Sequence, residues 1–190
     1  SITACSMTYS FGQLRTAFYE TLFHASKAIK LKRTSMSWTI LGFGKHKSKT
    51  LPQVLFTDPD WFFWAIEADV FKNKGALHSE ANDINYKARN IKIPNDDEGS
   101  LSVEYYIHKP TGKFSHFDVV PTSQPEHIGS SPSFRSQLVD MSVPRKIAPY
   151  DKLGCKQLVS SLKTCLFGNK SKRMTKNICE EFFDDPNNFA

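Results

Sequence analysis

The sequence predicts an α+β fold, and three observations lead to that class. Apolar and polar residues alternate through residues 101–119, which is the two-residue period of a half-buried strand and its return. Helix-start signals stand at Thr50, Asp58 and Asp151, each before a segment with apolar side chains at helical spacing. Residues 11–29 repeat apolar side chains at three- and four-residue steps, which predicts one more helix. We therefore expect helices together with a single β-hairpin.

Length and composition set the outer bounds. A chain of 190 residues with 39% hydrophobic residues can form a real core, either as one domain or as one domain with an appendage. The 25 lysines and arginines exceed the 19 aspartates and glutamates, and the net charge of +6 favours polyanionic partners without demanding them. No segment approaches the roughly 18 apolar residues of a membrane span, so no membrane contact through such a span is expected.

The cysteines predict neither a disulfide framework nor a zinc site. No pair has CxxC spacing, and no secretion signal precedes them. We therefore expect reduced thiols, a cytoplasmic location and no metal or other cofactor. The four cysteines are Cys5, Cys155, Cys165 and Cys179.

Residues 1–35 predict a helical extension ahead of the main domain. Its apolar face is followed by a basic segment, and positive charge suits the C-terminal end of a helix. We expect this helix to pack on its own domain or on a second copy, so residues 10–31 are a candidate homo-oligomer contact. A membrane-surface or targeting role is the alternative. The apolar face comprises Phe11, Leu14, Phe18, Leu22, Ala25 and Ile29, and the basic segment comprises Lys27, Lys30, Lys32 and Arg33.

The most specific stretch covers residues 40–71 and predicts a strand, a basic turn and two helices. Residues 40–44 combine apolar residues with glycines, as in a short strand that runs into a turn. Thr50 is placed to cap the first helix. Asp58 before Pro59 marks the start of the second helix. That helix carries Trp61, Phe62, Phe63, Trp64 and Ile66 and reaches toward Val70.

Residues 41–71 resemble the small C-terminal domain of exodeoxyribonuclease X-like proteins. The family pattern is roughly a Phe-Gly-Lys-x-Lys-Gly-Lys turn, a short helix and Asp-Pro-x-aromatic-x-x-Trp. The chain departs from it at Ser48, where the family usually has a second glycine, and at Trp61, where it has Tyr or Phe. The resemblance implies a nucleic-acid-associated module without a catalytic set of its own, which accompanies a nuclease domain or stands alone. The matching residues are Phe43, Gly44, Lys45, His46, Lys47, Lys49, Thr50, Leu51, Val54, Asp58, Pro59, Trp61 and Trp64.

Behind this motif the chain alternates between regular and irregular segments. A further helix is predicted from Ser79 to Ala88, and residues 95–99 read as a polar loop. The hairpin follows over residues 100–120. Residues 121–136 are rich in proline, glycine, serine and threonine, so we expect a long loop without regular structure, anchored at Phe134–Arg135.

Residues 137–190 predict a return to helix. Asp151 can cap a helix that ends at Gly168, and a basic segment leads into a final helix. The expected apolar residues of that final helix are Met174, Ile178, Phe182 and Phe183. Together these elements give one α+β domain over residues 36–190. It comprises the motif region 36–94, the hairpin and loop 95–136 and the helical region 137–190.

The basic turn is the candidate functional site. Lysine side chains bind phosphates without selecting a sequence, and an aromatic face stacks on any base. We expect phosphate contacts at the turn and base stacking on Phe43 and Trp61, whereas burial in the core is the alternative for Trp61, Phe62 and Trp64. The basic segment before the final helix is expected to join the turn in one patch. The candidate contacts are Lys45, His46, Lys47 and Lys49 in the turn and Lys170, Lys172 and Arg173 in that segment.

The predicted function is a non-catalytic nucleic-acid-binding or nuclease-associated accessory protein of bacterial or phage-like origin. Its expected partners are DNA or RNA, through the phosphate backbone, and a nuclease or other protein. Neither a phosphate-binding glycine motif nor a GxSxG elbow is present. Two alternatives stay open. One is a protein-interaction module that docks through the N-terminal helix. The other is a metal-dependent nuclease using Glu104, His108, His116 and Asp118, four residues that equally suit an ordinary solvent face.

Overall fold

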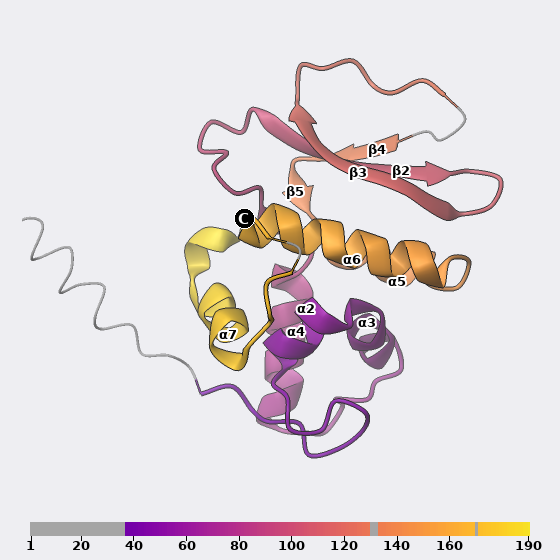
Figure 1. Ribbon diagram of the computed structural model, residues 1–190. Coiled ribbons are helices and arrows are strands. Elements are labelled where there is room, and N and C mark those ends of the chain that lie inside the picture. Colours follow the sequence, from indigo (N-terminus) through magenta and orange to yellow (C-terminus); the bar gives the residue numbers. More distant parts are fainter. Residues whose placement is uncertain (1–36, 130–132, 170) are drawn as a thin grey trace, which may run out of the picture. The chain divides into compact units, whose positions relative to one another are not determined.

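A computed structural model describes residues 37–129, 133–169 and 171–190, and their helices and strands confirm the α+β class (Figure 1). The helices are α2 (Leu51–Thr57), α3 (Pro59–Glu67), α4 (Ala76–Lys87), α5 (Val143–Ile147), α6 (Lys152–Phe167), α7 (Lys176–Asp184) and the short 3-10 helix η1 (Pro186–Asn188). The strands are β1 (Ile91–Lys92), β2 (Leu101–His108), β3 (Lys113–Pro121), β4 (Ser133–Ser136) and β5 (Leu138–Val139). The helix predicted within residues 1–35 lies outside the described residues.

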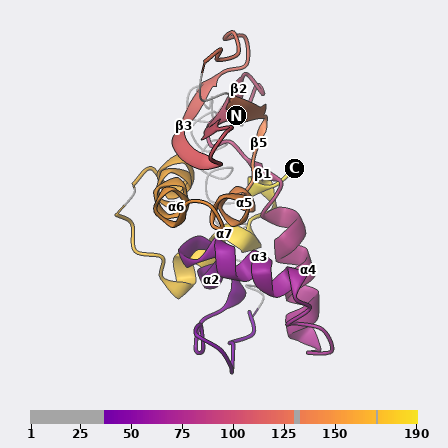
Figure 2. The ribbon, with the colours of Figure 1, turned by 90° about the vertical axis from the view of Figure 1, so that its right-hand side faces the viewer.

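Helix α6, with α5 beside it, lies between a small sheet and helices α2, α3, α4 and α7 (Figures 1 and 2). The sheet has the strand order β3-β2-β4 with antiparallel pairs, and a separate two-residue ladder joins β1 to β5. Helix α6 packs against β3 on one side and against α5 and α2 on the other, while α7 packs against α2. The motif built by α2 and α3 therefore belongs to the helical layer, across α6 from the sheet.

The centre of the helical layer is an aromatic cluster around Phe56 of α2. The Phe56 ring lies 5.0 Å from that of Phe167, 5.2 Å from that of Phe182 and 5.7 Å from that of Phe183. At its margin, the Trp38 indole Nε1 donates a hydrogen bond to Asp184 Oδ1 over 3.0 Å. The pairs of Phe56 with Phe167 and Phe182 are edge-to-face, a geometry that stabilises a core beyond the area that the rings bury. The cluster thus fastens α7 to the first helix of the motif.

The predicted hairpin is confirmed, with β2 paired to β3 from Leu101↔Pro121 to His108↔Lys113. The prediction of a structureless loop over residues 121–136 is wrong at its end, because Ser133–Ser136 forms strand β4 beside β2. Two long-range contacts select this strand. The Phe134 ring stacks on Tyr105 at 4.7 Å, and the Arg135 guanidinium pairs with Glu104. The predicted anchor at Phe134–Arg135 is therefore confirmed as part of a strand.

Several helix boundaries also differ from the prediction. Helix α4 begins at Ala76 instead of Ser79, and α3 ends at Glu67, which leaves Val70 outside it. Helix α7 begins only at Lys176, because Thr175 caps it by accepting the Ile178 N–H. Met174 therefore precedes the helix.

Within the described residues, no helix combines the length and the hydropathy that crossing a membrane requires.

Candidate nucleic-acid interface

The basic turn is a closed loop that leads directly into α2. Ile40 and Thr50 form an isolated antiparallel bridge, so the predicted strand is reduced to a single bridged residue. Inside this bridge the Leu41 N–H donates to the Lys49 carbonyl, and the Ser48 N–H donates to the Leu41 carbonyl, each over 2.8 Å. The loop ends with Thr50, whose N–H donates to Gln53 Oε1 of α2 over 3.3 Å. These bonds fix the turn on the first helix.

Ser48 occupies a backbone conformation that suits glycine. Its φ angle is +71°, in the left-handed region, where an L side chain costs about 1–2 kcal/mol. Ser48→Gly is therefore expected to raise the free energy of unfolding by about 0.5–1 kcal/mol, measured by urea unfolding. Ser123→Gly, at an exposed serine without a positive φ, is the control and is expected to lower stability slightly. A Ser48→Gly protein less stable than the unsubstituted protein would contradict this account.

Asp58 connects the basic turn to the start of α3. Its Oδ2 atom lies 2.6 Å from Lys45 Nζ and 2.9 Å from His46 Nε2, and its Oδ1 atom accepts the Trp61 N–H over 3.2 Å. Burial favours the neutral form of Asp58, but the hydrogen bonds from Lys45, Trp61 and His46 outweigh it and hold its pKa below the usual value. Asp58 is thus both the predicted cap of α3 and the anchor of the turn.

These contacts with Asp58 limit the ability of two predicted residues, His46 and Lys45, to bind phosphate. His46 is 7% exposed, and its ring lies 4.8 Å from Trp61 in an edge-to-face contact. Burial lowers the pKa of His46, so the neutral ring donates its Nε2 proton to Asp58. Lys45 already has an anionic partner in Asp58. This arrangement was not predicted, because the helix cap and the cationic turn are separate features of the sequence.

The other predicted residues divide between exposed and occupied positions. Lys47 is exposed on the turn, whereas Phe43 and Trp61 are half-buried against the core. The Phe43 ring is covered by Lys74 Nζ at 4.7 Å, and Lys172 Nζ lies 5.1 Å from the Phe167 ring. Burial in the core was the alternative for three aromatic residues of α3. Phe62 is buried, Trp61 is half-buried and Trp64 is 43% exposed. Lys170 lies outside the described residues.

Lys49 and Arg173 line one open hollow of about 380 Å³. This brings one residue of the basic turn together with one residue of the basic segment before α7, whereas Lys45, Lys47 and Lys172, which were expected in the same patch, do not line the hollow. Lys176, at the start of α7, lines the same hollow and was not among the predicted contacts. The signal that could have found it is Thr175, a capping residue that fixes the beginning of α7 beside the basic segment. We call this site the basic hollow; its lining is Lys49, Gln53, Thr57, Arg173, Met174, Thr175 and Lys176.

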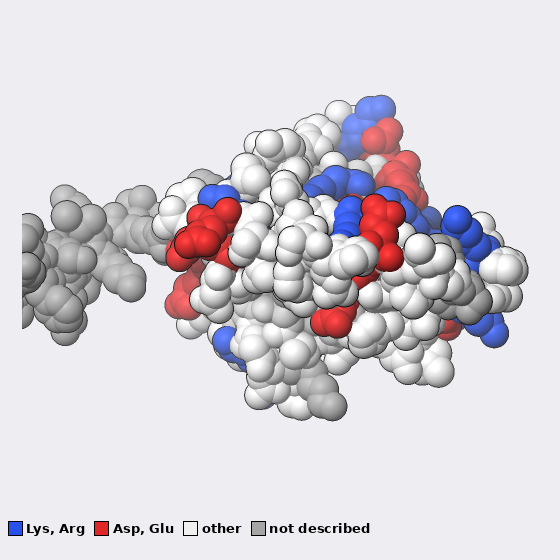
Figure 3. Space-filling model, turned by 90° about the horizontal axis from the view of Figure 1, so that it is seen from above, with Lys and Arg blue, Asp and Glu red and all other residues white. Residues whose placement is uncertain are grey.

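Few acidic side chains offset the charges of the basic hollow within the described part of the chain; Glu180, one turn along α7, interacts electrostatically with Lys176. No ion pair there joins Lys49, Arg173 or Lys176 to a carboxylate. The basic and acidic side chains described on the sheet-side face, by contrast, lie next to one another (Figure 3). A local excess of positive charge attracts anions more strongly than a mixed surface does. The basic hollow is therefore better suited to bind an anion than the sheet-side face is.

The hairpin residues considered for a metal-dependent nuclease do not gather into a metal site. Glu104 is fully buried and accepts hydrogen bonds from Tyr106 and Ser133 in addition to its pair with Arg135. His116 and Asp118 are exposed, with 3.8 Å between Nε2 and Oδ2. Across the described residues, no three His, Cys, Asp or Glu side chains are grouped closely enough to hold a metal ion.

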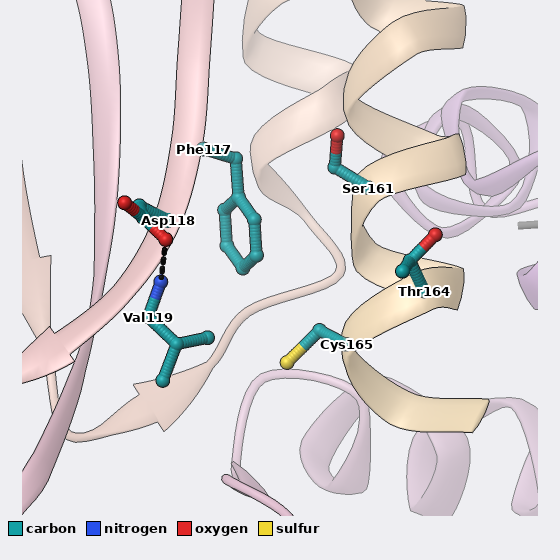
Figure 4. A pocket seen from close by; sticks show the side chains of 6 residues that line it. All are labelled: Phe117, Asp118, Val119, Ser161, Thr164 and Cys165. Carbon is teal, nitrogen blue, oxygen red and sulfur yellow. Dashed lines mark hydrogen bonds between the residues drawn. The ribbon is translucent and has the colours of Figure 1, made fainter. Parts of the chain in front are cut away.

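A second hollow, of about 280 Å³, lies between β3 and α6 (Figure 4). The Asp118 carboxylate at its margin accepts the Val119 N–H over 2.8 Å, which satisfies a backbone donor of the edge strand. Burial raises the pKa of the Cys165 thiol in this hollow to about 11, so the reactive thiolate is scarce at neutral pH. The lining residues are Phe117, Asp118, Val119, Ser161, Thr164 and Cys165.

Comparison with known proteins does not test the resemblance of residues 41–71 to exodeoxyribonuclease X-like proteins, which stays a prediction. The chain matches no family model, and no curated protein or solved structure is significantly similar to it.

Proposed function

We propose that this protein binds nucleic acid as an accessory protein, through phosphate contacts centred on the basic hollow. The observation that carries the proposal is the meeting of Lys49 with Arg173 and Lys176, three cations from two distant segments of the sequence that line one open hollow. Lys47 extends this surface along the exposed turn. Association with a nuclease is a further part of the proposal and rests on the resemblance at residues 41–71.

The mechanism is electrostatic and does not depend on base sequence. Each lysine or arginine that neutralises a phosphate releases condensed counterions, so affinity falls as salt rises. Lys45 and His46 contribute to this surface indirectly, because their contacts with Asp58 hold the turn in place. Phe43 and Trp61 are half-buried, and their main contribution is likewise to the packing of the motif.

The triple variant Lys49→Gln, Arg173→Gln, Lys176→Gln tests the proposal. We expect its affinity for a labelled DNA or RNA at low salt to fall on the order of tenfold to hundredfold. The slope of log K against log salt should become shallower by about 2 for a single strand and about 3 for a duplex. Fluorescence anisotropy across a salt series measures both, and product length in the presence of magnesium is checked on the same samples.

A matched control removes the same charge elsewhere. Lys109, Lys113 and Lys156 are exposed lysines on the hairpin and α6, and none of them lines the basic hollow. Replacing all three by glutamine lowers the net charge by the same amount and should leave the salt slope close to that of the unsubstituted protein. Equal losses in the two triple variants would show that binding follows net charge alone. No binding by the unsubstituted protein at low salt would overturn the proposal.

A further inference from the structure

We propose that the basic hollow binds a phosphomonoester, the terminal phosphate of a nucleic-acid strand. This inference rests on the proposed function and specifies the group that the hollow recognises. An internal phosphodiester carries one negative charge, whereas a monoester carries about −1.5 to −2 at pH 7 and has three strong acceptor oxygens. The two candidate ligands therefore differ in charge distribution: a terminal phosphomonoester concentrates its charge at one point, and a backbone of phosphodiesters spreads it along the strand.

The arrangement of the cations favours the concentrated charge. Lys49, Arg173 and Lys176 all line one hollow, so three cations border the same small volume. A duplex spreads its charge at about one per 1.7 Å of helix axis, and proteins that follow it distribute their cations accordingly. The hollow of about 380 Å³ corresponds to roughly a dozen water molecules. That volume suits a phosphate with its adjoining sugar and is far too small for a duplex.

The uncharged lining residues add hydrogen-bond donors. The Gln53 Oε1 atom accepts the Thr50 N–H, so the free end of this side chain is its NH2 group, a donor. The Thr175 oxygen accepts the Ile178 N–H, which leaves its hydroxyl proton to be donated. Thr57 already donates its hydroxyl proton to the Gln53 carbonyl, so Gln53 and Thr175 are the two uncharged donors. No carboxylate lines the hollow, and an Arg-containing donor set of this kind is well matched to phosphate oxygens.

Strand ends give a direct test. The same short single strand is prepared with a 5′ phosphate, with a 3′ phosphate and with hydroxyls at both ends, and the affinity of the full chain for each is measured at one salt concentration. We expect one of the phosphorylated strands to bind about tenfold more tightly than the hydroxyl strand. Equal affinity for all three would overturn the inference and leave the proposed function standing. Binding of none of them would instead overturn the proposed function.

Two single variants separate the hollow from the surrounding surface. Arg173→Gln should reduce the preference for the phosphorylated end to less than about twofold, and Arg173→Lys should restore part of it. Lys47→Gln removes an exposed cation of the turn that does not line the hollow, so it should weaken all three strands by a similar factor and keep the preference. A preference lost with Lys47→Gln but kept with Arg173→Gln would place terminal-phosphate binding elsewhere and overturn the inference.

A competition experiment distinguishes the source of the phosphate. Inorganic phosphate and a nucleoside monophosphate are each titrated against the labelled phosphorylated strand. Displacement only at concentrations well above that of an unlabelled phosphorylated strand supports a strand end as the ligand. If inorganic phosphate displaces the labelled strand at the same concentration as the unlabelled phosphorylated strand does, the hollow binds a free anion and the inference is overturned.

Discussion

Glu104→Ala is expected to lower the free energy of unfolding by about 3–5 kcal/mol. Removing one member of a buried ion pair leaves the other charge without compensation, and Arg135 would be that charge. Glu104 is fully buried, and Tyr106, Ser133 and Arg135 all donate hydrogen bonds to it. Arg135 also donates to the Gln124 and Pro125 carbonyls. The substitution should therefore weaken β4 and the described part of the preceding loop together.

The same carboxylate predicts a pH dependence. Burial alone would raise the pKa of Glu104, but the hydrogen bonds from Ser133, Tyr106 and Arg135 hold it at about 2. A carboxyl whose pKa is lower in the folded state stabilises the protein above its unfolded pKa, near 4.5, and this contribution is lost as pH falls toward 2. The stability difference between the unsubstituted protein and Glu104→Ala should therefore shrink between these pH values.

Urea unfolding across pH measures both effects. Asp118→Ala is the matched control, because Asp118 stands opposite Glu104 in the β2–β3 register but is exposed. Its cost should stay near 0.5 kcal/mol. If the Glu104→Ala and Asp118→Ala proteins unfold at the same urea concentration, the network around Glu104 does not carry the stability assigned to it.

Gly154→Ala is expected to destabilise the protein by about 2–4 kcal/mol, although the same change inside a helix ordinarily stabilises by up to about 1 kcal/mol. Gly154 is the third residue of α6, at the contact with the hairpin. A Cβ atom there would clash with Asp151 Oδ2 and lie 2.7 Å from Phe114 Cβ. Asp151 accepts the Gly154 N–H over 2.8 Å and the Phe114 N–H over 3.2 Å. The methyl group would therefore disturb the helix cap and the hairpin contact at once.

Thermal unfolding distinguishes this from a general effect of alanine. Gln157→Ala, at an exposed position on the same helix, should change stability by no more than a few tenths of a kcal/mol. An alanine at position 154 that is neutral or stabilising would mean that the Asp151 side chain and the hairpin can move aside at little cost.

The features that could be predicted from the sequence are those decided by neighbouring residues. Asp58 and Asp151 cap helices as expected, because a cap needs only a side-chain oxygen and an N–H three residues later. The alternation through residues 101–119 likewise sufficed for the hairpin. Strand β4 could not be predicted, because its pairing depends on a buried carboxylate about thirty residues earlier and on a ring stacked on Tyr105.

The same division holds for the candidate site. The cationic character of the turn is visible in the sequence, and so is the basic segment before α7. The burial of His46 was not foreseen, because it requires the turn to fold back on Asp58. The two basic segments predicted a patch that includes Lys49 and Arg173, but the place of Lys176 beside them depends on how α7 packs on α2.

The closure of the aromatic cluster also bears on how quickly the domain can fold. Trp38 and Asp184, which bond at its margin, are 146 residues apart in sequence, and Phe56 likewise packs on rings from α6 and α7. Contacts between distant residues require long loops to close before they contribute energy, so folding slows as their share grows. Helix α2 is short, and isolated helices of this length are marginal in water. One of its main packing partners is α7, near the other end of the domain. The basic hollow, which spans α2 and the start of α7, should therefore form late in folding.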